Sequence, residues 1–133
     1  MSSDMGLECY ENGDPGLMPA DLVRRVLGPF VVDPSSDRWE LAFPDGSGGD
    51  MMPVTDEPSP GLCIDHYHGA GLLNAIYEIM RQTHSIMWWS GGPDVITADE
   101  HIADHLPSGF IEQLGPPALV RSGADILAEI AKT

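Results

Sequence analysis

Glycine and proline recur along the whole chain and limit it to short helices and strands. The sequence contains 15 Gly and 12 Pro among 133 residues. Proline lacks the backbone N–H that helix interiors and inner strands need, and clusters of both residues are typical of turns. We therefore expect many short elements joined by tight connections, without a linker long enough to separate domains. Because this length suits one domain, residues 1–133 are predicted to form a single domain.

Apolar residues at helical spacing predict helices in four places. Residues 70–82 carry the clearest pattern, with apolar side chains three, four and seven positions apart. The other helices are expected at residues 19–27, 98–106 and about 123–132.

Strands are predicted where apolar residues alternate or form short runs between turns. Trp39, Leu41 and Phe43 alternate with less apolar neighbours, which is the clearest period of two in the chain. The strands expected on these grounds span residues 7–10, 38–43, 61–68, 84–89 and 95–96, and residues 30–32 are expected to be a short extended piece. Residues 44–60 are rich in Gly, Ser, Pro and acidic side chains and are predicted to be a loop, with residues 51–54 extended.

The order of these elements predicts an α+β fold. Through residue 89 the chain reads strand, helix, strand, strand, helix, strand, which is the split β-α-β order of ferredoxin-like sheets. We expect a mainly antiparallel sheet with helices packed on one face. The last segment would be a C-terminal helical extension of that unit.

The charge of the chain restricts its partners. With 21 Asp and Glu against 6 Lys and Arg, the formal net charge is −15. Phosphate backbones and anionic membranes attract cations, so neither nucleic acid nor a membrane surface is expected as a partner. The same field favours a basic protein, although solubility alone would also account for it.

Location and redox state follow from features that the sequence lacks. No apolar run is long enough to span a membrane, and no secretory signal is visible at the start of the sequence. A cytoplasmic protein is therefore expected. In that compartment Cys9 and Cys63 would be free thiols.

Two pairs of histidines have the spacing of metal ligands. His66 and His68 would share one face of a strand, and His101 and His105 would share one side of a helix. The glutamate that follows the first histidine in zinc-protease helices is missing here. Solvated or hydrogen-bonded histidines are the preferred interpretation, so no metal or cofactor is predicted and the chain is expected to fold without metal.

No catalytic constellation stands out. Ser47 lies in a Gly-rich loop without the strand-to-helix turn of a nucleophile elbow. Cys63 has no cationic neighbour in the sequence to lower its pKa, and the single lysine, Lys132, leaves phosphate binding without support. We expect a protein that is not an enzyme.

The predicted loop at residues 44–60, here called the acidic loop, is the most distinctive candidate surface. Aromatic and methionine side chains are favoured at interface centres, and a surrounding acidic rim steers a basic partner. The partner-binding residues predicted on these grounds are Asp45, Asp50, Asp56, Glu57 and Trp39. For Trp39 the alternative is a core position in its strand.

In these features the chain resembles the immunity proteins of bacterial toxin–immunity pairs. The likeness covers the whole chain: a small, acidic, cysteine-poor α+β domain with a Pro44-Asp45-Gly46 turn, an acidic loop and no catalytic constellation. It implies tight, stoichiometric binding that blocks a toxic enzyme domain. Separately, we expect the protein to be a monomer or simple dimer. The alternatives are a small metal-dependent enzyme using the His66/His68 and His101/His105 pairs, and a structural accessory subunit.

Overall fold

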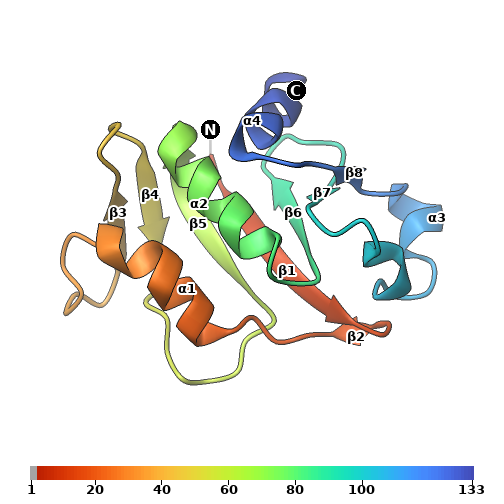
Figure 1. Ribbon diagram of the computed structural model, residues 1–133, viewed down its shortest axis with the longest axis horizontal. Coiled ribbons are helices and arrows are strands. Elements are labelled where there is room, and N and C mark those ends of the chain that lie inside the picture. Colours follow the sequence, from red (N-terminus) through yellow and green to blue (C-terminus); the bar gives the residue numbers. More distant parts are fainter. Residues whose placement is uncertain (1–2) are drawn as a thin grey trace.

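The computed structural model describes residues 3–133, which form an open, mostly antiparallel sheet of eight strands with four helices packed against it (Figure 1). The strands are β1 (Met5–Glu11), β2 (Asp14–Pro15), β3 (Trp39–Ala42), β4 (Gly48–Met51), β5 (Gly61–His68), β6 (Ser85–Trp89), β7 (Ile96–Thr97) and β8 (Ala118–Leu119). The helices are α1 (Ala20–Leu27), α2 (Ala70–Met80), α3 (Phe110–Leu114) and α4 (Gly123–Ala131), with 3₁₀ turns η1 (Gly28–Phe30) and η2 (Ile102–Asp104).

The strand order is β3-β4-β5-β1-β6-β7-β8, and β2 pairs only with β1. All neighbours in this order run antiparallel except β7 and β8, which are parallel. Strand β1 lies between β5 and β6, which helix α2 connects. The predicted α+β class with a mainly antiparallel sheet is confirmed.

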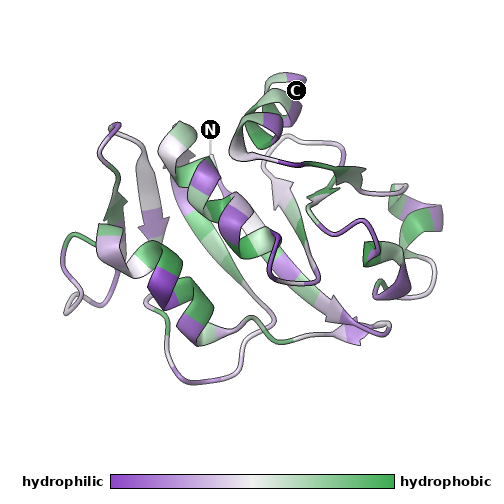
Figure 2. Cartoon of the chain, in the orientation of Figure 1, coloured by the Kyte–Doolittle hydropathy of each residue, from purple (hydrophilic) through white to green (hydrophobic). Residues whose placement is uncertain are grey.

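The main core lies between the sheet and helices α1 and α2, which cover the same face (Figure 1). Alternation along β1 directs Met5, Leu7 and Cys9 to that side, where all three are buried. Helix α2 contributes its predicted apolar residues, among them Leu72 and Ile76, which are fully buried. Each such side chain contributes about 1.5–3 kcal/mol by leaving water. Helix α1 contains both hydrophilic and hydrophobic residues, which Figure 2 shows as purple and green segments.

Helix α4 packs along α2 as the predicted C-terminal extension. Ser122 caps it by accepting a hydrogen bond from the N–H of Asp125 at 3.1 Å. A Cβ at Gly123 would lie 2.1 Å from the side-chain oxygen of Asn74. The absent side chain therefore permits the close approach of the two helices.

A second hydrophobic cluster covers part of the opposite sheet face. Ile86 alternates with the core residues of β6 and packs against Ile102 and Leu106 from the segment after β7. On the same face farther along the sheet, Glu40 and Cys63 stay exposed. This face is thus covered over β6 and open over β3 to β5.

One strand lies where the sequence predicts a loop. Strand β4 separates β3 from β5, so the ferredoxin-like pairing expected for residues 38–43 and 61–68 is not confirmed. A Cβ at Gly48 would lie 2.1 Å from the carbonyl oxygen of Leu41, and one at Gly49 2.6 Å from Ile64. Glycine fits this inner strand because the neighbours approach too closely for a side chain.

The helix predicted for residues 98–106 is wrong, since only the 3₁₀ turn η2 forms there. The carboxylate of Asp99 accepts the His101 N–H at 2.9 Å and lies 2.7 Å from His84. Such side-chain bonds compete with a helix for the backbone groups. Residues 30–32, expected to be a short extended piece, form the end of η1 and an isolated antiparallel bridge from Val31 to Leu41.

The ends of the sheet are short. At one end β3 has four residues, and the N–H of Val32 donates to the carbonyl of Glu40 at 2.9 Å. At the other end β8 has two residues and follows Pro117.

Among residues 3–133, no helix combines the length and apolar character needed to cross a membrane.

Candidate functional site

Asp45 and Ser47 of the predicted acidic loop hold the N-terminus of α2. Asp45 accepts hydrogen bonds from the N–H of Gly71 at 2.8 Å and from the Ser47 hydroxyl at 2.6 Å. The buried Ser47 oxygen in turn accepts from the N–H of Leu72 at 2.9 Å. The hydrogen bond from the Ser47 hydroxyl, with two backbone N–H groups, lowers the pKa of Asp45. Asp45 is therefore placed to orient α2.

The other predicted site residues lie in different surroundings. Trp39 is a core residue of β3 with 8% of its surface exposed, as its alternative interpretation proposed. Asp56 forms an ion pair with Arg24 of α1 at 2.8 Å, so a cation of this chain already offsets its charge. Glu57 is exposed, and Asp50 lies half-buried in β4. The structure therefore separates the five residues.

The open sheet face carries the carboxylates Glu8, Glu40, Asp50 and Asp65, and we call it the acidic face. The last three form a row across β3, β4 and β5. The strand registers place Glu40 opposite Asp50, and Asp50 opposite Asp65. Directly opposite residues of antiparallel strands point to one face, and like charges there destabilise the pairing. The bases in contact with the row are Arg38, which pairs with Asp65, and His66, 3.3 Å from Asp50.

Trp88 lies on the same face. A Cβ on Gly6 would be 2.4 Å from the indole of Trp88, so the ring lies over the backbone of β1. Next to it, burial raises the pKa of the Cys63 thiol. Three carboxylates add to that effect: Asp65, Glu8 and Asp4. The open face thus combines a half-buried aromatic ring with a negative field.

A pocket of about 590 Å³ adjoins the acidic face and is lined by the segment 51–60, the start of α1, and the paired strands β1 and β5. Its lining is largely apolar and includes Trp88, Met52 and Val54. Two charged side chains line it, Glu8 and Glu57, and both are acidic. An apolar surface with carboxylates at its border suits a long cationic side chain, whose methylene stem is apolar and whose head is charged.

The histidine pairs predicted from spacing are not arranged as ligand pairs. His66 adopts a left-handed backbone (φ 54°) where the register of β4 and β5 shifts, so strict alternation with His68 is lost. His68 lies within hydrogen-bond distance of the carbonyls of Gly46 and His66. His101 lies 4.0 Å from Glu100, whereas His105 faces residues elsewhere in the chain.

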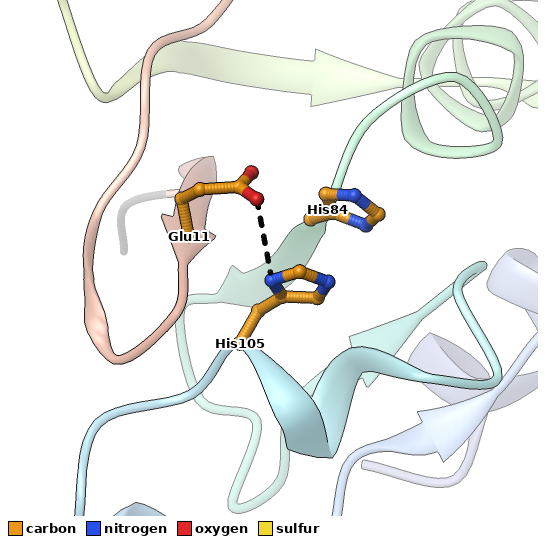
Figure 3. Close-up of side chains that lie close together, drawn as sticks. All are labelled: Glu11, His84 and His105. Carbon is orange, nitrogen blue, oxygen red and sulfur yellow. Dashed lines mark ion pairs between the residues drawn. The ribbon is translucent and has the colours of Figure 1, made fainter.

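The structure instead brings together Glu11, His84 and His105, here called the histidine cluster (Figure 3). One potential ligand atom from each lies within 4.8 Å of the others. Glu11 ends β1, His84 directly precedes β6, and His105 follows η2. The two imidazole rings are stacked, with centroids 3.8 Å apart and planes 19° from parallel.

Asp99 completes the surroundings of this cluster. Its carboxylate lies 2.7 Å from Nδ1 of His84, and 14% of its side chain is exposed. Burial raises the pKa of Asp99, but hydrogen bonds from His84 and the His101 N–H outweigh that effect and leave the pKa below its ordinary value. His84 is thus oriented by a carboxylate, as metal-binding and catalytic histidines commonly are.

Sequence spacing missed the histidine cluster because its members are far apart in the chain. Periodicity relates residues within one element, whereas Glu11 and His84 meet through the pairing of β1 with β6. The sequence offers one usable signal: Glu11 directly follows one predicted strand and His84 begins another, so pairing of these strands in antiparallel fashion brings the two residues together.

Comparison with protein-family models, with curated proteins and with solved structures finds no match for this chain.

Proposed function

We propose that this chain is a non-enzymatic binding protein that neutralises or regulates a more basic partner protein. The partner would dock on the acidic face and place a cationic side chain in the adjoining pocket. The observation that carries the proposal is the juxtaposition of opposed carboxylates with a pocket whose charged lining residues, Glu8 and Glu57, are both acidic.

The carboxylate row supports a cationic partner on energetic grounds. Folding alone gains nothing from placing Glu40, Asp50 and Asp65 opposite one another, because like charges on paired strands repel. Arg38 offsets one of the three, through its ion pair with Asp65. An incoming cationic surface would relieve the remaining repulsion, and its long-range attraction would speed association.

The pocket supports an anchor within that interface. Arginine and tryptophan are enriched among the residues that dominate binding energy, and a guanidinium over an indole face gains a cation–π interaction. Trp88 is half-buried and lines the pocket together with Glu8. An Arg or Lys of the partner could therefore contact the ring and a carboxylate at once.

The resemblance to immunity proteins extends this proposal to a specific role. In that role the chain would act in the cytoplasm, as a monomer or simple dimer, and inhibit a toxin enzyme by binding it in a fixed stoichiometry. The acidic face is not the loop expected from the sequence to bind the partner. Two of the predicted residues still belong to the proposed interface: Asp50 lies on the acidic face, and Glu57 lines the adjoining pocket.

The test begins with affinity retrieval of partners from the source organism. Calorimetry then establishes stoichiometry, and the partner's activity is measured against added protein. An immunity role predicts complete inhibition at a fixed molar ratio. A partner whose activity is unaffected would contradict inhibition and leave a structural accessory role.

A pair of charge-matched variants tests the proposed surface. The first combines Glu40→Gln, Asp50→Asn and Asp65→Asn, and the control combines three exposed acids elsewhere: Asp94→Asn, Asp104→Asn and Glu112→Gln. Both change the net charge by the same amount. Stopped-flow association at low salt should slow several-fold or more in the first variant and little in the control. Equal rates in the two variants would show that the acidic face is not the docking surface.

A further inference from the structure

We propose that Glu11, His84 and His105 bind one divalent transition-metal ion, with Zn²⁺ the ion that suits their chemistry best. Two imidazole nitrogens and one carboxylate oxygen are an established ligand set for zinc, leaving room for water at the remaining position. Within residues 3–133, this is the group of three His, Cys, Asp or Glu side chains whose ligand atoms converge, all within 4.8 Å.

The contact between Glu11 and His105 points to a cation. The N–H of Asn12 donates to Nδ1 of His105 at 3.2 Å, so this nitrogen presents a lone pair. The carboxylate Oε1 of Glu11 lies 3.6 Å from the same nitrogen (Figure 3). Two electron-pair donors therefore lie at about the edge length of a tetrahedral zinc site, roughly 3.3–3.6 Å for bonds of about 2.0–2.2 Å. A metal ion between them would replace the Asn12 contact and remove the repulsion.

His84 already has the carboxylate partner that metal-binding histidines commonly have. Its Nδ1 is 2.7 Å from the carboxylate of Asp99, which leaves Nε2 for the ion. Asp99 is held in turn by the N–H of His101 at 2.9 Å. A carboxylate behind a ligating imidazole fixes its tautomer and makes it a stronger donor.

One side chain must turn for the ion to bind. The lone pairs of stacked imidazoles do not converge, and the ligand atoms, which lie up to 4.8 Å apart, must approach by up to about 1.2–1.5 Å to reach a tetrahedral edge. The side chain of His84 is 46% exposed, against 15% for His105. His84 therefore has the room to leave the stack, while His105 stays in place.

The ion would tie three distant parts of the chain together. Glu11 ends β1, His84 precedes β6, and His105 belongs to the segment that covers Ile86 on the outer sheet face. The main core lies on the other face and includes none of the three. The chain is therefore still expected to fold without metal, and the ion adds stability to the 95–110 segment. Because Glu11 is 55% exposed, chelators can reach the ion.

The test titrates ZnCl₂ into protein freed of metal by dialysis against EDTA, at pH 7.5. Calorimetry should find one ion per chain, and the melting temperature should rise by several degrees. His84→Gln should weaken binding at least tenfold, and Asp99→Asn by about 10- to 100-fold. Affinity should also fall as the pH is lowered, because protons compete with the ion for its ligands.

Control variants separate this site from other histidines. His66→Gln and His101→Gln change the exposed imidazoles that sequence spacing singles out, and both should bind Zn²⁺ like the unmodified protein. Glu11→Gln supplies a second ligand variant on an exposed side chain, in case His84→Gln perturbs folding. Absence of binding, or unchanged affinity in both ligand variants, would overturn the proposal.

Discussion

The capping of α2 by a distant turn gives the sharpest stability prediction, for Ser47→Ala. The buried N–H of Leu72 donates to the Ser47 hydroxyl at 2.9 Å, and 3% of Ser47 is exposed. The residue before the helix, Gly69, supplies no side-chain cap. Removal of the hydroxyl therefore leaves the Leu72 N–H without its acceptor in a place that water does not reach.

The Ser47 hydroxyl also donates to Asp45, which keeps its hydrogen bond from the Gly71 N–H, so the magnitude follows chiefly from the loss of the bond to the Leu72 N–H. Removing a helix N-cap costs about 1 kcal/mol, within about 0.5–2. A buried donor left unsatisfied costs about 1–3 kcal/mol. These describe the same loss, so we expect Ser47→Ala to lower the free energy of unfolding by about 1–3 kcal/mol. At about 3 °C for each kcal/mol in a chain of this size, the melting temperature should fall by about 3–9 °C.

Urea unfolding followed by tryptophan fluorescence measures this change. The midpoint should fall while the dependence on urea concentration stays constant, because the surface exposed on unfolding is unchanged. The matched control is Ser35→Ala, whose hydroxyl donates to Asp33 at 2.7 Å in an exposed turn. It should change stability by less than about 0.5 kcal/mol. Equal losses in the two variants, or none in Ser47→Ala, would refute the capping argument.

Three further predictions concern thiols, fluorescence and acid. Native protein should show one slowly reacting thiol, Cys63, and denatured protein two, because burial raises the pKa of Cys9 to about 11; rapid labelling of both in native protein would contradict this. Neutral acrylamide should quench the fluorescence of Trp88 more than the anion iodide does at low salt, and the difference should shrink as salt screens the acidic face. Trp88→Phe should abolish this difference between the two quenchers. The lowered pKa of Asp99 means that its stabilisation is present above about pH 4, the ordinary carboxyl value, and is lost as pH falls through the lower folded value. The acid-induced fall in stability should therefore be shallower in Asp99→Asn, as measured by urea midpoints from pH 5 to 2.

Elements with a strong local pattern could be predicted from the sequence. Helix α2 and strand β5 match the expected ranges closely, because their apolar residues repeat at the period of one element. Strand β4 could not be predicted in this way, since Gly48 and Gly49 contribute no side chain to a hydrophobic period. Its place in the sheet depends on close contacts with β3 and β5, which only the folded chain provides.

The candidate sites depend on register and on long-range pairing. Asp50 faces Asp65 because the register shifts beside the left-handed His66, and spacing in the sequence does not encode that shift. Glu11 and His105 come together across more than half the chain. Composition indicated a negative field correctly, but its position on the sheet required the strand order.

The short ends of the sheet bear on how copies of this chain behave at high concentration. A long, flat edge strand presents free backbone N–H and C=O groups that recruit further strands and begin aggregation. Here Val32 covers part of the outer side of β3 through its hydrogen bond to Glu40, and β8 exposes two residues after Pro117. Neither end offers the six- or seven-residue template that cross-β stacking uses. Any self-association of this protein should therefore proceed through side-chain surfaces and reverse on dilution, without growth into fibrils.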